Sequence, residues 1–313
     1  MSRSLPITLS ITLSISLLLT TIMTSAPVAA QGRERLGYGR IFNNDLIGDG
    51  QDRWRTGNIA SSRVWGMGWE GRVPEGFGEL LELRFNGEII APENLSNPAP
   101  GDRPYAGALS LGLHTHFHRG PIDYAVGADL VVIGPQTGLF DFHDALHDIV
   151  GGQELSGQLK RAQVSNEVRP SAVVEAGRDY DLGPARLRPF VEARLGVEDL
   201  IRLGADVTFG GVGDGELLIR DPVTGQRYRT IYAPHEGYSF VIGGDVAYVD
   251  DSDYLPSGSG VKVTEDRTRL RAGLHWQGRN GTALYYGVTW LSEEFDNQRE
   301  GQFIGSLRLR LRF

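Results

Sequence analysis

Two histidines, His143 and His147, lie four residues apart in the segment Asp141–Gly152, where apolar residues recur at spacings of three and four. That periodicity predicts a short helix, which Gly151 and Gly152 would end. On a helix the two imidazoles share one face. They could bind a metal together, or one of them could act as a catalytic base. A solvent-exposed loop helix without a chemical role is the alternative.

The elements that must position this helix are β-strands, because apolar and polar residues alternate along much of the chain. The pattern is plain in Leu187–Val197, Arg267–Trp276 and Phe303–Phe313, each with one apolar and one charged face. A soluble sandwich would bury the apolar face, whereas a transmembrane barrel would turn it to lipid and the charged face to the lumen. Segments of ~10 residues match a tilted membrane strand, which favours the barrel.

The first 30 residues have the pattern of a secretory signal peptide. Arg3 gives a positive start, residues 7–23 are uncharged, and Val28-Ala29-Ala30 supplies the small residues that a signal peptidase recognises. We therefore expect cleavage after Ala30 and an exported chain of residues 31–313. The formal net charge of −8 argues against nucleic acid as a partner, and the lack of cysteine excludes disulfides and thiolate chemistry.

The fold that we expect is all-β, an antiparallel transmembrane barrel of twelve strands with the short helix in an extracellular loop. The expected strands are residues 36–43, 54–67, 77–86, 105–117, 121–134, 170–179, 187–198, 202–210, 237–249, 265–277, 281–292 and 303–313. Short turns should lie on the periplasmic side and longer loops outside. Residues 211–236 break this rule, being long on the inner side, and turn signals at 213–215 and Thr224-Gly225 allow a further hairpin there.

The outward loops gather the residues that could do chemistry. The loop after the first strand carries Asn43, Asn44, Asp45, Asp49 and Asp52 and ends at Thr56. Oxygen ligands of these kinds suit a hard cation such as Ca²⁺, which could polarise an ester carbonyl. A nearby neutral histidine could deprotonate water. Together they indicate a metal-assisted hydrolase acting outside the cell, and a polar hairpin loop is the alternative.

Several motifs, in order along the chain, resemble the outer-membrane lipid A 3-O-deacylase family (LpxR-type). The most specific is the run Gly101-Asp-Arg-Pro-Tyr-Ala-Gly107, preceded by Ile90-Ala-Pro-Glu-Asn94. Weaker matches are Asn44-Asp45, Asp52 with Thr56, Gly134-Pro135, His147-Asp-Ile-Val-Gly151, Glu294-Phe-Asp296 and Gly305-Ser-Leu307. The similarity runs from about residue 36 to the end. The chain departs from the family where Arg55 replaces an aromatic residue and His143 replaces an expected glutamine.

The resemblance implies a twelve-stranded barrel that removes the 3′-acyloxyacyl group from lipid A with Ca²⁺. Asn44, Asp45 and Thr56 would form the metal and oxyanion region, and His147 would be the general base. The signature residues Asp102, Arg103 and Tyr105 would shape the site or contact lipid A phosphates, which suit arginine. A carboxylate orienting His147 is expected, with Glu154 the nearest candidate.

We therefore predict a monomeric hydrolase of the bacterial outer membrane. Its active site would face outward, its substrate would be lipid A or lipopolysaccharide, and its cofactor would be Ca²⁺. A barrel phospholipase and a non-catalytic barrel are the alternatives. His114, His116 and His118 share one strand face and could bind a transition metal, although their place near the periplasmic end favours a polar lining of the lumen.

Overall fold

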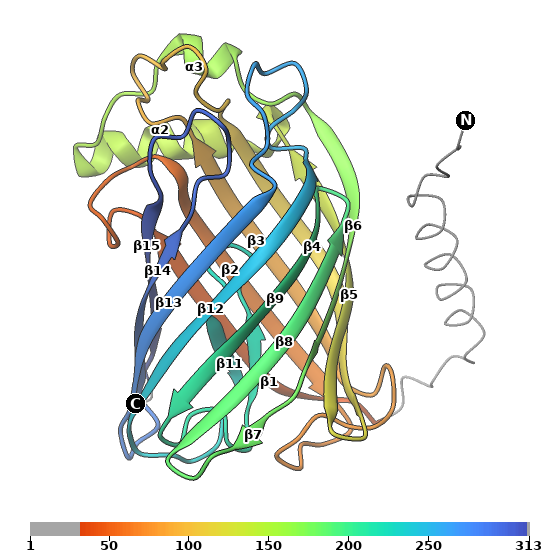
Figure 1. Cartoon of the computed structure of the whole chain (residues 1–313). Helices are drawn as coiled ribbons and strands as arrows, with labels where there is room; N and C mark the ends of the chain where they lie inside the picture. The colour runs from red at the N-terminus through yellow and green to blue at the C-terminus, as the bar shows by residue number, and fades with distance from the viewer. Residues whose placement is uncertain (1–31, 312–313) are drawn as a thin grey trace, which may run out of the picture. The chain divides into compact units, whose positions relative to one another are not determined.

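The computed structural model describes residues 32–311, and residues 34–311 form a closed antiparallel barrel of twelve strands (Figure 1). The barrel strands are β1 (Glu34–Asn44), β2 (Trp54–Gly66), β3 (Leu81–Ala91), β4 (Ala106–Arg119), β5 (Ile122–Ile133), β6 (Glu167–Gly177), β8 (Ala185–Leu195), β9 (Glu198–Phe209), β12 (Gly237–Ser252), β13 (Asp266–Gln277), β14 (Ala283–Leu291) and β15 (Gln302–Arg310). β1 pairs with β15, and β6 pairs with β8 past the two-residue β7 (Tyr180–Asp181). The predicted fold class is confirmed.

The alternation of side chains separates an apolar outer wall from a charged lumen. In β13, Arg269 and Arg271 are buried, whereas Leu270 between them is 55% exposed. The same holds in β8, where Arg188 and Glu192 face inward. This is the distribution of a barrel that meets lipid on its outside, and the opposite of a soluble sandwich.

No helix within residues 32–311 is both long and apolar enough to cross a membrane. The predicted signal peptide and its cleavage after Ala30 lie outside the described residues.

The third strand is the clearest error among the predicted boundaries. We expected residues 77–86, but β3 is Leu81–Ala91. Asn86-Gly87 has the composition of a turn, yet both residues lie within the strand, and Gly87 is paired with Ile59 and Leu109. The Asn86 side chain faces the lumen, where its Oδ1 accepts a hydrogen bond from Asn58. In a soluble protein such a polar residue would often end a strand. In this barrel it can lie within a strand, because its side chain faces the polar lumen.

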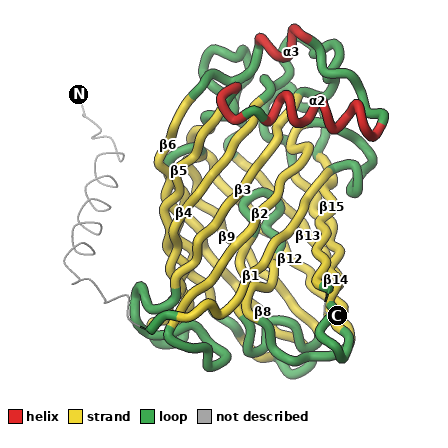
Figure 2. The backbone as a smooth tube through the Cα atoms, turned by 180° about the vertical axis from the view of Figure 1, so that it is seen from behind, coloured by secondary structure: helices red, strands yellow, loops and turns green. Residues whose placement is uncertain are grey.

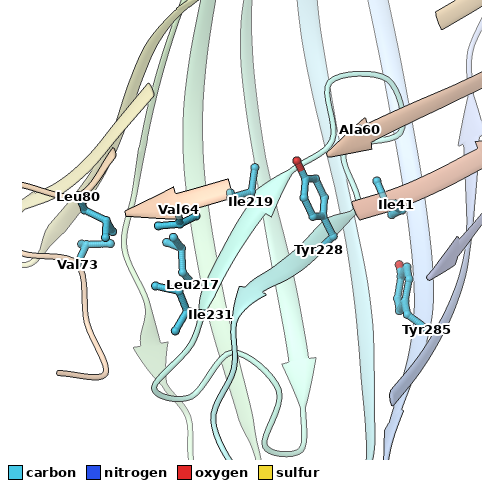
Figure 3. Close-up of a cluster of buried hydrophobic side chains, with 10 residues drawn as sticks. All are labelled: Ile41, Ala60, Val64, Val73, Leu80, Leu217, Ile219, Tyr228, Ile231 and Tyr285. Carbon is cyan, nitrogen blue, oxygen red and sulfur yellow. The ribbon is translucent and has the colours of Figure 1, made fainter. Parts of the chain in front are cut away.

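Residues 211–236 form the further hairpin that the turn signals allowed. Its strands are β10 (Leu217–Arg220) and β11 (Arg227–Ile231), and it packs against the inside of the wall. Figure 3 shows Leu217, Ile219 and Tyr228 of the hairpin among inward apolar side chains of the barrel. The long inner connection therefore fills the lumen.

Ion pairs fix this hairpin to the opposite wall. Arg220 Nε lies 2.8 Å from Glu175 Oε2, and Arg220 Nη1 lies 3.0 Å from Asp206 Oδ2. The lumen is filled by paired charges and apolar contacts, an arrangement that does not suit a water-filled pore.

The helices gather at one end of the barrel, here called the helix rim. They are η1 (Pro135–Thr137), α2 (Leu139–Val150) and α3 (Gly157–Arg161), all in the connection between β5 and β6. Figure 2 shows α2 lying crosswise to the strands at this end. The predicted helix Asp141–Gly152 is thus confirmed, two residues earlier than expected.

Candidate active site

Helix α2 turns its histidines inward and its apolar residues outward. Phe140, His143 and His147 form the buried face, whereas Phe142 and Ile149 are exposed, Ile149 by 82%. The helix ends at Gly151, whose φ of 76° is a left-handed conformation that glycine adopts without strain. Because the buried stripe carries polar rings, the barrel residues beneath α2 must supply their partners.

His147 is held at both ring nitrogens. Its Nδ1 lies 2.6 Å from the carbonyl oxygen of Gln153, which can only accept, so Nδ1 carries a proton. Its Nε2 lies 2.7 Å from Asp52 Oδ2. The ring is therefore fixed with its basic nitrogen toward the loop between β1 and β2.

Asp52 joins the histidines to a group of oxygen ligands. Its Oδ1 contacts the Thr56 hydroxyl and lies 3.6 Å from His143 Nε2. Thr56 Oγ1 also lies 3.2 Å from Asp45 Oδ1. We call Asp45, Asp52, Thr56, His143 and His147 the rim cluster.

A β-bulge at the start of β2 places Thr56 in this cluster. The register with β3 shifts between Trp54 and Gly57, and Trp54 has a φ of 52°. Such a backbone costs on the order of 1–3 kcal/mol for a non-glycine residue and persists only when its neighbours hold it. Gln302 of β15 holds it, accepting a 3.0 Å hydrogen bond from Arg55 N and donating one of 3.0 Å to Arg53 O.

The signature run 101–107 supports α2 from below. Tyr105 is buried, packs edge-on against Phe140 at 5.1 Å, and its hydroxyl lies 3.3 Å from His143 Nδ1. A Cβ on Gly107 would lie 2.8 Å from Leu139 Cβ, so only glycine lets the helix start so close to β4. The most distinctive motif of the sequence therefore positions the histidine helix.

The predicted site residues Asn44, Asp102 and Arg103 contact the loops or the lumen and not the histidines. Asn44 Nδ2 donates to Thr56 O at 2.9 Å and its Oδ1 accepts from Leu46 N, so its amide shapes the loop that carries Asp45. Asp102 accepts hydrogen bonds from two backbone amides of its own loop. Arg103 is 2% exposed and its Nη1 lies 2.6 Å from Glu294 Oε2. This burial fits the shaping role expected for Arg103, and contact with lipid A phosphates stays a prediction.

Sequence reasoning missed two partners of the histidines. Asp52 was recognised as part of a motif but not as the carboxylate that meets His147, for which Glu154 was the nearest candidate. The Gln153 carbonyl, which orients His147, leaves no signal in side-chain chemistry. One signal in the sequence did point to Asp52. It lies close to Thr56, and both residues were predicted to lie on the loop that carries Asp45.

The two carboxylates of the rim cluster differ in their electrostatic surroundings. Burial, with Asp52 and Asp49 nearby, raises the pKa of Asp45 to about 8 despite hydrogen bonds from Arg53 N and Thr56. Burial also acts to raise the pKa of Asp52, but hydrogen bonds from His143 and Thr56 and the charge of the two imidazoles hold it below its usual value. Two carboxylates and a hydroxyl thus converge without an arginine or lysine partner among the ion pairs of the described residues. This donor set fits a hard divalent cation such as Ca²⁺.

Comparisons with known proteins place the chain in a family. The family model described as "Outer membrane protein LpxR" matches residues 13–313. Among solved structures, LpxR from Salmonella typhimurium has a TM-score of 0.68 at 18% identity, covering 88% of this chain and 100% of that one. An outer membrane channel from Pseudomonas putida F1 has a TM-score of 0.41 at 12% identity, covering 91% and 98%. A search among curated protein sequences found no match.

Proposed function

The chain belongs to the LpxR family of outer-membrane proteins, and from this premise we propose that it hydrolyses an acyl ester of lipid A, removing the 3′-acyloxyacyl group. The observation that supports the proposal most is the contact of His147 Nε2 with Asp52, beside the oxygen ligands of Asp45 and Thr56. A positioned base next to a cation site suits metal-assisted ester hydrolysis.

In the proposed reaction His147 acts as the base. Its Nε2 takes a proton from water, and the water oxygen forms a bond to the ester carbonyl carbon. When the tetrahedral intermediate collapses, the ester C–O bond breaks and the imidazolium returns the proton to the leaving alkoxide. The Gln153 carbonyl and the Asp52 carboxylate accept from the two ring N–H groups and stabilise the imidazolium between these steps.

Asp45 and Thr56, with Asp52 Oδ1 facing the same place, are the side chains that would hold Ca²⁺. The bound ion would polarise the carbonyl and stabilise the oxyanion. Asn44 was predicted as a further ligand, but its amide hydrogen-bonds to the loop backbone, so it is not among the side chains proposed here to hold the ion. The proposed site faces outward from the cell, and the substrate enters from the lipid leaflet beside α2.

The test is the acyl pattern of lipid A in cells that express the chain. Mass spectrometry should show loss of the 3′-acyloxyacyl group with the wild type and an unmodified pattern with His147→Gln. Loss of a general base typically slows a reaction by about 10²–10⁴-fold.

His118→Gln is the matched control, since it removes a buried histidine of β4 far from the rim cluster and should deacylate normally. An unmodified pattern with the folded wild type would contradict the proposal. If purified protein released fatty acid from phospholipid and not from lipid A, the chain would be a phospholipase.

A further inference from the structure

The two histidines of α2 and Asp52 are also arranged as a nitrogen-rich metal site. Asp52, His143 and His147 each offer one ligand atom, and these atoms lie within 4.8 Å of one another. Two ligand atoms of one tetrahedral zinc ion lie about 3.4 Å apart, so the widest of these separations would have to shorten by up to about 1.4 Å to complete the set. Histidines four apart on a helix are suited to this geometry, because both rings reach the same side.

The hydrogen bonds behind the rings support this assignment independently. His147 Nδ1 donates to Gln153 O, so the nitrogen that can act as a ligand is Nε2, which faces Asp52. The Tyr105 hydroxyl lies 3.3 Å from Leu139 O, to which it can donate, and 3.3 Å from His143 Nδ1, from which it can then accept. Partners on the remote nitrogens fix the tautomer of metal-binding histidines, and here both Nε2 atoms face Asp52.

We infer that Asp52, His143 and His147 bind a transition-metal ion of the zinc class and that this ion inhibits the hydrolysis proposed above. Imidazole nitrogen selects such ions over Ca²⁺, which prefers oxygen. An ion on His147 Nε2 occupies the lone pair that would take the proton from water, and it draws Asp52 away from Thr56. The inhibitory part rests on the proposed function, whereas the binding part stands on geometry alone.

His143 is the residue that distinguishes the proposed metal site from the proposed catalytic site. It lies beside Asp52 but has no part in the proposed proton transfer. A glutamine at position 143 can still meet the Tyr105 hydroxyl, yet it offers no imidazole to the metal. His143→Gln therefore removes one ligand while the proposed base, Asp45 and Thr56 remain.

The test uses the purified full barrel in detergent. Co²⁺ titration should give visible absorption bands in the wild type and in the control His118→Gln, and Zn²⁺ should displace them. His143→Gln should bind Zn²⁺ at least about tenfold more weakly. Equal Zn²⁺ affinity of the wild type and His143→Gln, or the absence of Co²⁺ bands, would overturn the proposed site.

Inhibition is measured as lipid A deacylation with saturating Ca²⁺ and increasing Zn²⁺. Each variant is compared with its own zinc-free rate, so a change in basal rate does not affect the result. The inhibiting Zn²⁺ concentration should rise in His143→Gln by the same factor as the loss of affinity. Zn²⁺ binding without inhibition of an active enzyme would overturn the regulatory part. A chain without deacylase activity would contradict the proposed function while leaving the Co²⁺ result to judge the metal site.

Discussion

Two clusters of buried charge meet at the start of β2 and are built on opposite principles. Arg55 points into the lumen and Thr56, its neighbour in the chain, belongs to the rim cluster. The lumenal group, here called the arginine cluster, pairs three guanidinium groups with three carboxylates: Arg55, Arg103 and Arg267 with Glu88, Glu198 and Glu294. The rim cluster has two carboxylates and two imidazoles and no arginine.

The difference is visible in Asp45 and Glu294, two acids in loops at the helix rim. Burial acts to raise the pKa of Glu294, but the charges of Arg55, Arg267 and Arg103 hold it well below its usual value. Burial raises the pKa of Asp45 to about 8, because no such cation lies beside it. Glu294 already has cationic partners within the protein, whereas Asp45 has none among the ion pairs of the described residues. We therefore assign a structural role to the arginine cluster, and the proposed function assigns cation binding to the rim cluster.

Removing one acid from the arginine cluster should give the largest loss of stability. Glu294→Gln leaves three guanidinium groups with two carboxylates in a buried place, which typically costs about 3–5 kcal/mol. The midpoint of denaturant unfolding in detergent should fall accordingly, and the matched change Asp45→Asn should not lower it. An unchanged midpoint for Glu294→Gln would contradict the structural role assigned to this cluster.

The pH dependence of stability should distinguish the clusters next. Asp45 has a pKa of about 8 in the fold against 3.8 for the free side chain, so the folded state binds this proton more tightly than the unfolded state. Its contribution to the free energy of unfolding is complete below about pH 4 and is lost as pH rises toward 8. Chelated wild type should lose stability over this window, and Asp45→Asn should give a flatter profile. Identical pH profiles of the two proteins would show that a positive charge within the protein already compensates the Asp45 carboxylate.

The smallest effect is expected where the scaffold touches the rim cluster. Tyr105→Phe removes a hydroxyl whose contacts with Leu139 O and His143 Nδ1 are both long, at 3.3 Å. A neutral hydrogen bond contributes about 0.5–1.5 kcal/mol, so kcat/KM should fall by at most about tenfold. A drop as large as that of His147→Gln would instead place Tyr105 in the reaction itself.

The strand pattern could be predicted because it depends on local alternation, and the site could be predicted only in part. The twelve strands follow from which face of each segment meets lipid, and errors arose where a polar residue such as Asn86 lies inside a strand. The histidine helix was recognised by its spacing, but its orientation was not. Its apolar residues, which would be buried in a soluble protein, are exposed, and its histidines face the barrel wall.

Long-range partners were the part that the sequence did not reveal. The contact of Asp52 with His147 joins loops about a hundred positions apart, and the Gln153 carbonyl that orients the ring is a backbone atom. The hairpin of residues 211–236 had turn signals, yet its place inside the lumen depends on pairs such as Arg220 with Glu175. These contacts follow from closure of the barrel and not from the pattern of any one segment.

The most direct test of the account is a Ca²⁺ titration of lipid A deacylation by chelator-treated protein. The wild type should be inactive without added metal and should recover with Ca²⁺, at lower Ca²⁺ concentrations as the pH approaches 8 and Asp45 loses its proton. Asp45→Asn should stay inactive at every Ca²⁺ concentration while remaining folded. Full activity of the chelated wild type, or an unaltered Ca²⁺ response in Asp45→Asn, would contradict the claim that the rim cluster lacks a counter-charge in order to bind a cation.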